Sequence, residues 1–200
     1  MNMDITWMNE AGLDTQTGIS YTGNTEKYVS AVQRFYKNYE KNRAKVEEYF
    51  AGKDYENFMI TVHALKSNAK MIGATNLSGS FEALENAARE QDTATIEALT
   101  PPVLRDYAEL MEKLEPVGEM GDVKAADEIP ADIARTTVER LLAALDDFDD
   151  EEAKKQAKVL SGYPFRLTQA EKLKEAAAFI EDFMYDEAAD IIRQIAMTIE

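Results

Sequence analysis

One stretch of the sequence, VHALKSNAKMIGA at residues 62–74, holds the only histidine in the chain. Lys66 follows His63 by three residues and Lys70 follows it by seven. An imidazole can act as a nucleophile, a general base or a metal ligand near neutral pH. Three roles are therefore open to His63: a packed core residue, a metal ligand, or a group presented to another molecule for reaction.

The helical period around His63 places its ring on the outer face of a helix. The apolar stripe steps by four, three, four and three residues, through Phe58, Val62, Leu65, Ala69 and Ile72. At about 100° per residue, His63 lies about 140° from the centre of this stripe. The predicted outward face also contains Ile60, Ser67, Lys70 and Ala74, with Lys66 on its flank.

This outer face is suited to carrying negative charge. A phosphoryl group adds about two negative charges, which Lys66 and Lys70 can offset without covering the ring. Ser67 and Ala74 are small enough for another protein to approach, and Ile60 offers an apolar docking contact. The spacing alone fits equally well a solvated helix face that happens to carry one histidine and two lysines.

Metal binding and hydrolytic catalysis find little support in the sequence. The chain has no cysteine, and positions 59, 60, 66 and 67 hold no Asp or Glu that could join His63 around a metal. No carboxylate lies in helical register to orient the ring, and no glycine-rich phosphate loop or nucleophile elbow is present. We therefore expect no metal site and no cofactor.

Composition favours an acidic, all-α protein. The 200 residues are 45% hydrophobic with few glycines and prolines, and the net charge is −16. Nucleic acids and anionic membranes are poor partners for such a chain, because both require clustered Lys and Arg. No apolar run approaches the roughly 18 residues of a membrane span. We expect a cytoplasmic protein with no membrane contact through this segment.

Helical periods divide the chain into two bundles. Apolar positions predict helices over 25–50, 54–72 and 76–90, and Thr100 before Pro101 predicts the start of a fourth that ends near Leu114. Residues 1–115 then form an antiparallel four-helix bundle, and the glycine- and proline-containing segment 116–130 is a linker. Residues 131–200 form a second, smaller bundle, with helices predicted over 131–148, 150–161, 168–182 and 186–199. Thr168 and Glu171 have the spacing of a capping box at the third of these.

The second half contains an internal repeat. Residues 144–160 align with 179–195 at an offset of 35, which matches Phe148 with Phe183. We interpret the repeat as two helical hairpins of one bundle, since two units are too few for a solenoid.

Residues 54–67 also align with 149–162, which places Lys158 where His63 stands. Either the second half is a degenerate copy of the first, or two helices with acidic starts align by chance.

The stretch HALKSNAKMIGATNLSGSFEALENAA resembles the signature of histidine-containing phosphotransfer (HPt) domains. It has H-x-L-K-[G/S] followed by small residues, a glycine ten positions after the histidine, and then L-x6-L-E. Upstream, NEAGLDTQTGISYTGNTEKYVSAVQRF is similar to the family's G-[L/I]-D, its G-[L/I] turn and its Y-x3-[L/V]-x2-F helix. The resemblance covers about residues 8–115. The second half also resembles the helical tail that follows HPt domains in hybrid sensor kinases and receiver–HPt proteins.

The resemblance implies a role for particular residues. His63 would be the phosphorylated residue, Lys66 the lysine that supports the phosphoryl group, and Gly73 the family's helix-packing glycine. Ser67 stands where glycine is commoner. Autophosphorylating kinases usually have an acidic residue directly after the histidine, whereas Ala64 stands here and no nucleotide-binding glycine boxes follow.

The resemblance therefore implies a phosphocarrier rather than an enzyme. His63 would take a phosphoryl group from a receiver-domain aspartate and pass it to another receiver. The receiver would supply the catalytic carboxylates and Mg²⁺. The chain could be a piece of a hybrid histidine kinase, with that kinase as a partner in cis. The alternative is a helical interaction or regulatory module in which His63 is never phosphorylated.

Overall fold

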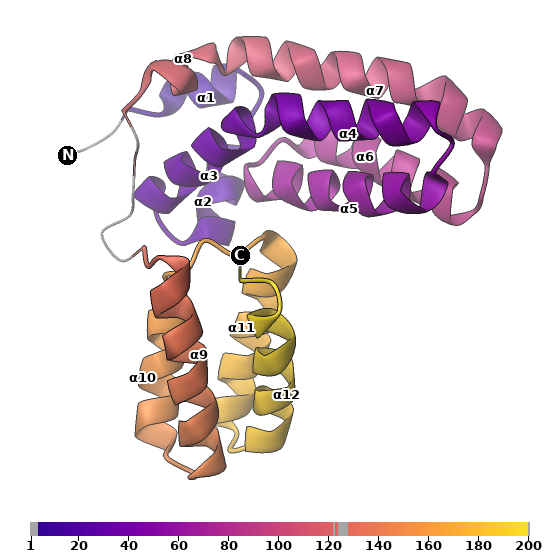
Figure 1. Ribbon diagram of the computed structural model, residues 1–200. Helices are drawn as coiled ribbons and strands as arrows, with labels where there is room; N and C mark the ends of the chain where they lie inside the picture. Colours follow the sequence, from indigo (N-terminus) through magenta and orange to yellow (C-terminus); the bar gives the residue numbers. More distant parts are fainter. Residues whose placement is uncertain (1–3, 122, 124–127, 200) are drawn as a thin grey trace. The chain divides into compact units, whose positions relative to one another are not determined.

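The computed structural model describes residues 4–121, 123 and 128–199, and these residues form helices and connecting turns without strands (Figure 1). The all-α prediction is therefore confirmed. The chain divides into two compact units, residues 1–124 and 125–200. Each unit has its own hydrophobic core.

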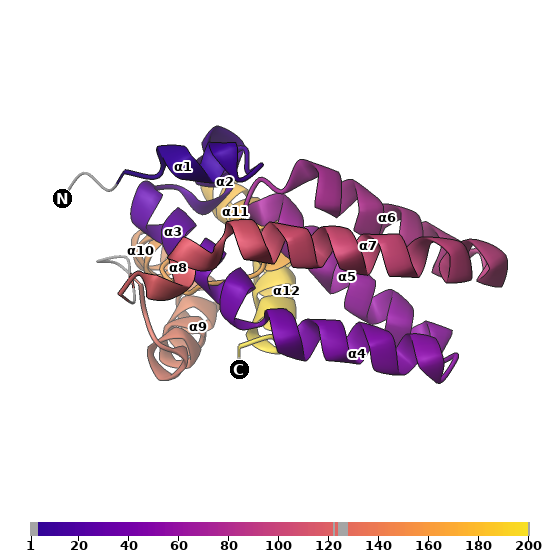
Figure 2. The ribbon, with the colours of Figure 1, turned by 90° about the horizontal axis from the view of Figure 1, so that it is seen from above.

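The first unit is built on a four-helix bundle of α4, α5, α6 and α7 (Figures 1 and 2). Three further helices precede the bundle and one follows it. The bounds are α1 Thr6–Glu10, α2 Thr15–Thr22, α3 Thr25–Lys37, α4 Tyr39–Ala51, α5 Tyr55–Met71, α6 Thr75–Arg89, α7 Thr93–Lys113 and α8 Glu115–Glu119.

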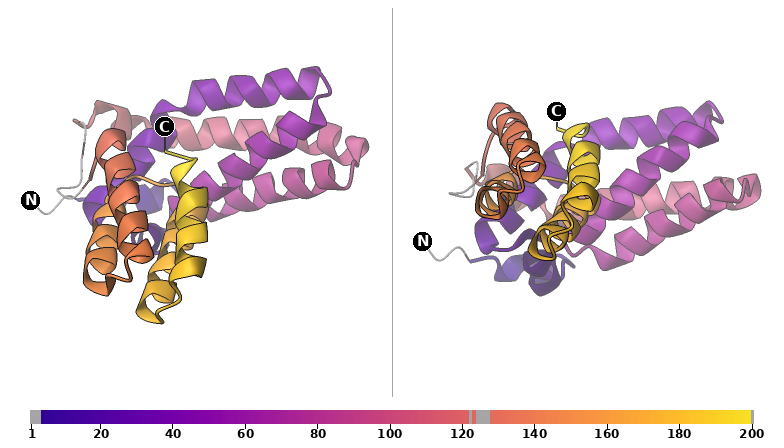
Figure 3. Two further views of the ribbon diagram at one scale, coloured as in Figure 1. Left: turned by 60° about the horizontal axis from the view of Figure 1, so that its bottom comes forward. Right: turned by 90° about the horizontal axis from the view of Figure 1, so that it is seen from below.

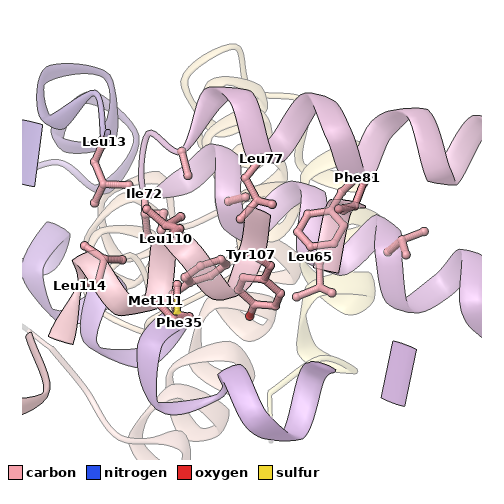
Figure 4. Packing of buried hydrophobic residues seen from close by; sticks show 14 of the residues in the cluster. Leu13, Phe35, Leu65, Ile72, Leu77, Phe81, Tyr107, Leu110, Met111 and Leu114 are labelled. Atoms are coloured by element: carbon pink, nitrogen blue, oxygen red, sulfur yellow. The ribbon is translucent and has the colours of Figure 1, made fainter. Parts of the chain in front are cut away.

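Tyr107 lies at the centre of the bundle core. Its fully buried ring contacts Phe35 at a centroid distance of 5.4 Å, Tyr39 at 4.8 Å and Phe81 at 5.6 Å. These contacts join α3, α4, α6 and α7, and Figure 4 shows Leu65 of α5 beside them. Edge-to-face and tilted ring pairs of this kind stabilise a core beyond their buried area alone. The helix that carries His63 is therefore packed against a rigid aromatic centre.

The helix predicted over residues 25–50 is interrupted at Asn38. Here α3 ends at Lys37 and α4 begins at Tyr39. The Arg34 carbonyl accepts hydrogen bonds from both the backbone amide of Asn38 at 3.1 Å and its side-chain amide at 2.9 Å. The apolar period continues across the interruption, so periodicity did not reveal it.

The fourth helix starts earlier than the sequence predicted. The expected start at Thr100–Pro101 is wrong, because α7 begins at Thr93 and continues through Pro101 and Pro102. The Asp92 carboxylate caps α7 by accepting hydrogen bonds from the Thr95 amide at 3.1 Å and the Thr95 hydroxyl at 2.6 Å. Thr100 is fully buried, and its hydroxyl donates to the Ile96 carbonyl at 2.7 Å.

The beginning of the expected linker 116–130 packs on the first unit. Helix α8 follows α7 directly, and Val117 is almost fully buried. The buried Gln33 side chain donates to the Gly121 carbonyl at 3.0 Å and accepts a hydrogen bond from the Val123 amide at 3.0 Å. The remainder of this segment includes residues 122 and 124–127, which lie outside the described residues.

The second unit consists of two helical hairpins packed side by side (Figure 3). Its helices are α9 Ala131–Asp146, α10 Asp150–Leu160, α11 Leu167–Glu181 and α12 Tyr185–Ala196. The four helices match the four predicted ones, but the Thr168–Glu171 capping box does not form. Helix α11 starts at Leu167, one residue before Thr168, and its N-cap residue Arg166 makes no side-chain cap hydrogen bond.

One turn geometry recurs along the chain: it is made with glycine after α1 and α5, at Gly12 and Gly73, and with other residues at four helical hairpins. The turns between α4 and α5, α6 and α7, α9 and α10, and α11 and α12 each contain a non-glycine residue with positive φ: Lys53, Gln91, Phe148 and Phe183. In each, the next residue donates its amide hydrogen to a carbonyl five residues earlier, as Schellman-type caps do. The internal repeat is therefore a repeated hairpin turn, and the alignment of Asp54 with Asp149 joins equivalent positions.

Gly73 follows helix α5, which carries His63, and its backbone hydrogen-bonds to Asp14 near the start of the chain. Its φ is +77°, and a Cβ atom there would lie 2.1 Å from the Asp14 carbonyl oxygen. The Asp14 amide donates to the Gly73 carbonyl at 2.9 Å. The glycine is required for the backbone conformation and for the close approach of the Asp14 backbone.

We predict that Gly73→Ala lowers the free energy of unfolding by about 2 kcal/mol or more, because it adds strain at positive φ and displaces the Asp14 backbone. Gly79→Ala is the matched control, since Gly79 lies within α6 with open space around its missing Cβ. That control should stabilise the chain by about 0.5–1 kcal/mol. Urea unfolding measures both, and equal effects would contradict the assigned role of Gly73.

Candidate functional site on helix α5

Helix α5 holds His63 in a defined position on the surface. The Asp54 carboxylate caps its first turn by accepting a hydrogen bond from the Asn57 amide at 3.2 Å. All five residues of the predicted apolar stripe are buried. The His63 side chain remains 50% exposed. The prediction that its ring faces outward is therefore confirmed.

A buried carboxylate lies beside the His63 ring. Glu85 of α6 has a side chain only 3% exposed, and its Oε1 lies 3.0 Å from Nδ1 of His63. The neighbouring Leu84 and Phe81 are fully buried, which fixes this face of α6 against the core. The Ser78 hydroxyl also donates to the Lys66 carbonyl at 3.1 Å, so α5 and α6 are joined close to the site.

Three basic side chains surround the Glu85 carboxylate. Besides His63, the Lys66 Nζ lies 2.7 Å from Oε2, and the Arg89 guanidinium forms an ion pair with Oε1. Burial of Glu85 opposes its ionisation, but hydrogen bonding and charge from Lys66 and His63 outweigh burial and hold the pKa of this carboxyl below its usual value. Glu85 is therefore ionised at neutral pH.

The ionised carboxylate determines which nitrogen of His63 can react. A carboxylate only accepts hydrogen bonds, so Nδ1 must carry the hydrogen that it donates to Glu85. In the neutral ring the lone pair is then on Nε2. The half-exposed ring thus presents a nucleophilic nitrogen to solvent, and the hydrogen bond at Nδ1 restricts its rotation.

The predicted docking residues divide into two groups. Ile60 is 57% exposed, and Lys70 is exposed with its Nζ 5.7 Å from the centre of the Tyr21 ring. Ser67 and Ala74 are buried, at 8% and 3% exposure, so placing them on the outward face was wrong. The sequence-based projection assumed that α5 buries a single stripe. In the structure, α5 packs against α2, α3, α4 and α6, so more of its surface is covered.

Neither Glu85 nor Arg89 was singled out as a site residue from the sequence. The L-E pair of the family pattern contains Glu85, and the four-residue spacing of Glu85 and Arg89 is visible on one helix. Their connection to His63, however, depends on how α6 packs against α5. Sequence spacing along one helix cannot reveal a carboxylate contributed by another.

Two other kinds of site are absent from the described residues. Among the described residues, no group of three or more His, Asp or Glu side chains is arranged to hold a metal ion. None of the described helices is long and apolar enough to cross a membrane.

We predict that the Glu85 charge makes the fold sensitive to acid. Folding lowers the pKa of the Glu85 carboxyl. The stabilisation that the Glu85 charge gives the fold is therefore complete above the unfolded-state pKa of about 4.3, and it is lost as pH falls through the lower folded-state pKa. Glu85→Gln should cost about 1–3 kcal/mol of unfolding free energy at pH 5.5. The difference from the unmodified chain should shrink at pH 3.

Urea unfolding at the two pH values measures this effect. Glu82→Gln, at an exposed position of the same helix, is the control and should change stability by less than about 0.5 kcal/mol at both. A cost of Glu85→Gln that did not change between pH 5.5 and 3 would argue against the assigned charge network.

Comparison with known proteins addresses the family directly. The Hpt domain model matches residues 30–150, which is more than half of the chain and extends from α3 to the start of α10. No curated protein and no solved structure matches. The matched range contains His63, Lys66 and Glu85 in the geometry described above. The chain therefore belongs to the Hpt domain family, whose members are phosphocarriers that exchange phosphoryl groups with receiver domains in two-component signalling.

Proposed function

We propose that the chain is a phosphorelay carrier in which Nε2 of His63 accepts a phosphoryl group from a receiver-domain aspartate and passes it to a second receiver. The observation that carries this proposal is the contact between Nδ1 and the buried Glu85, because it directs the Nε2 lone pair toward solvent. A histidine kinase in the same polypeptide would supply the first receiver. We place this exchange in the cytoplasm.

The transfer exchanges one bond to phosphorus for another. The Nε2 lone pair attacks the phosphorus of the aspartyl phosphate, an N–P bond forms, and the P–O bond to the aspartate breaks. The aspartate leaves as a carboxylate, and the hydrogen on Nδ1 stays in its bond to Glu85. The reverse step regenerates neutral His63. Mg²⁺ and the other carboxylates belong to the receiver, so this chain contributes orientation of the nucleophile.

Lys66 is suited to support the phosphoryl group. Its side chain is 23% exposed and already lies beside the imidazole through their shared partner, Glu85. Together with Arg89, it also offsets the carboxylate charge, which would otherwise repel an incoming phosphate. The Lys66 and Arg89 charges therefore balance the buried Glu85 carboxylate beside a ring that must receive a negatively charged phosphoryl group.

Ile60 provides an apolar contact next to the reacting ring. It precedes His63 by three residues on α5, and both side chains are exposed. Of the large hydrophobic side chains that are exposed among the described residues, Ile60 is the one in the first unit. We infer that the receiver docks over Ile60, with Lys70 at the margin of the contact.

We also infer that the second unit is a degenerate bundle of the same kind. Its two hairpins have the turn geometry of the first bundle. Anchoring the alignment on these turns places Lys158 opposite His63, Ser161 opposite Lys66 and Ala177 opposite Glu85. An ordinary lysine without a carboxylate partner does not reproduce the site, so this unit would not take part in transfer.

We predict that incubation with a phosphorylated receiver labels the chain at His63 and nowhere else. The label should be acid-labile and alkali-stable, and the His63→Gln variant should carry none, including in its second unit. Circular dichroism would establish that the variant is folded. If several phosphorylated receivers failed to label the folded wild-type chain, the carrier proposal would be wrong. The chain would then be a helical interaction or regulatory module in which His63 is not phosphorylated.

We predict a separate effect for the carboxylate that orients the ring. Glu85→Ala should slow phosphoryl transfer about tenfold, or about 1.4 kcal/mol of activation free energy, because Nδ1 and Nε2 would then compete for the hydrogen. Glu85→Gln should retain most of the rate, since its amide oxygen still accepts from Nδ1. Rapid-quench transfer kinetics and nitrogen–phosphorus NMR couplings test these rates and the Nε2 assignment. Equal rates for all three chains would count against the positioning role.

A further inference from the structure

The end of the second unit where the hairpins turn exposes an unusual aromatic surface. Phe148, between α9 and α10, is 74% exposed, and Phe183, between α11 and α12, is 66% exposed. We call Phe148, Phe183, Met184 and Tyr185 the turn face. It is distinct from the residues around His63.

The turn geometry does not explain the two phenylalanines. Phe148 and Phe183 have φ values of +57° and +60°, a region that favours glycine and asparagine and is uncommon for bulky residues. The same turns in the first unit are made with Lys53 and Gln91, which are polar. Because both rings are exposed, core packing does not account for them either. Their repeated presence indicates a role outside the fold of the unit.

The aromatic rings form one connected surface across the two turns. The Tyr185 ring lies between them, with centroids 5.7 Å from Phe148 and 6.2 Å from Phe183. Lys154 bridges the turns through ion pairs of 2.9 Å with both Asp150 and Glu181, and its Nζ lies 5.8 Å from the Phe183 ring centre. The surface is therefore held in place before any partner arrives, which lowers the entropic cost of binding.

Acidic residues flank the turn face in both hairpins, and three of them, Asp150, Glu152 and Glu181, form ion pairs with Lys154 or Lys155. Residues 146–152 and 181–187 contain ten acidic side chains and no Lys or Arg: Asp146, Asp147, Asp149, Asp150, Glu151, Glu152, Glu181, Asp182, Asp186 and Glu187. Lys154, just beyond, is occupied by its two ion pairs. A partner must therefore bring positive charge together with apolar groups.

We propose that the turn face docks a protein segment that presents apolar side chains flanked by Lys and Arg, such as a basic amphipathic helix. A second copy of this chain is disfavoured, because joining two turn faces would bring two sets of acidic residues together. Anionic lipid and nucleic acid are repelled for the same reason. The interaction does not depend on phosphorylation of His63, so failure of either proposal would leave the other intact.

Two designed helical peptides test the charge and apolar requirements on the full 200-residue chain. Both have the same Leu and Trp face, and their polar faces consist of Lys in one and Glu in the other. Titration calorimetry should give saturable binding of one Lys peptide per chain and no binding of the Glu peptide. Binding of both peptides, or of neither, would overturn the proposal.

Paired variants separate docking from folding. The double variant Phe148→Asn/Phe183→Asn should bind the Lys peptide at least about tenfold more weakly than the wild-type chain. Its melting temperature should not fall, because asparagine tolerates positive φ. Lys53→Asn with Gln91→Asn changes the equivalent turns of the first unit and should leave the affinity unchanged. Asp147→Lys with Asp182→Lys should weaken binding and reduce its dependence on salt.

Three results would overturn the assignment. The first is equal affinity of the Lys peptide for the wild-type chain and the phenylalanine variant, which would show that net charge alone attracts it. The second is self-association of the wild-type chain that the phenylalanine variant abolishes. The third is phenylalanine-dependent binding to vesicles of anionic lipid.

Discussion

The buried charge of Glu85 is the constraint on which the functional surface depends. A carboxylate with 3% of its side chain exposed is costly unless cations and hydrogen-bond donors compensate it. Here His63, Lys66 and Arg89 do so, and two of these three come from the neighbouring helix. The same contacts hold α5 against α6 and fix the orientation of the imidazole.

This arrangement depends on the rigidity of the bundle beneath it. The ring contacts of Tyr107 and the burial of the α5 stripe determine the positions of α5 and α6. Gly73 allows the Asp14 backbone to lie against the end of α5, where a larger residue would not fit. A shift of about 1 Å between the helices would break the contact between Nδ1 and Glu85, so packing far from the ring matters to its chemistry.

The two units use one hairpin turn for different purposes. In the first unit the turns carry polar residues and connect helices that present a histidine on a side of the bundle. In the second unit the equivalent turns carry Phe148 and Phe183, and the helices lack an imidazole and its carboxylate. The turn accepts different side chains at its positive-φ position because the hydrogen bond that closes it joins two backbone groups.

The sequence by itself determined the helical class, the buried stripe of α5 and the outward direction of His63, because helical period depends only on spacing along one chain. It also contained the family pattern around His63. The break at Asn38 and the early start of α7 accompany local hydrogen bonds that apolar spacing does not reveal. The burial of Ser67 and Ala74 required the tertiary structure, since neighbouring helices cover them. The same holds for the partnership of Glu85 with His63. Residues 22 apart in the chain meet only because α6 folds back along α5, and that approach is decided by packing across the whole core.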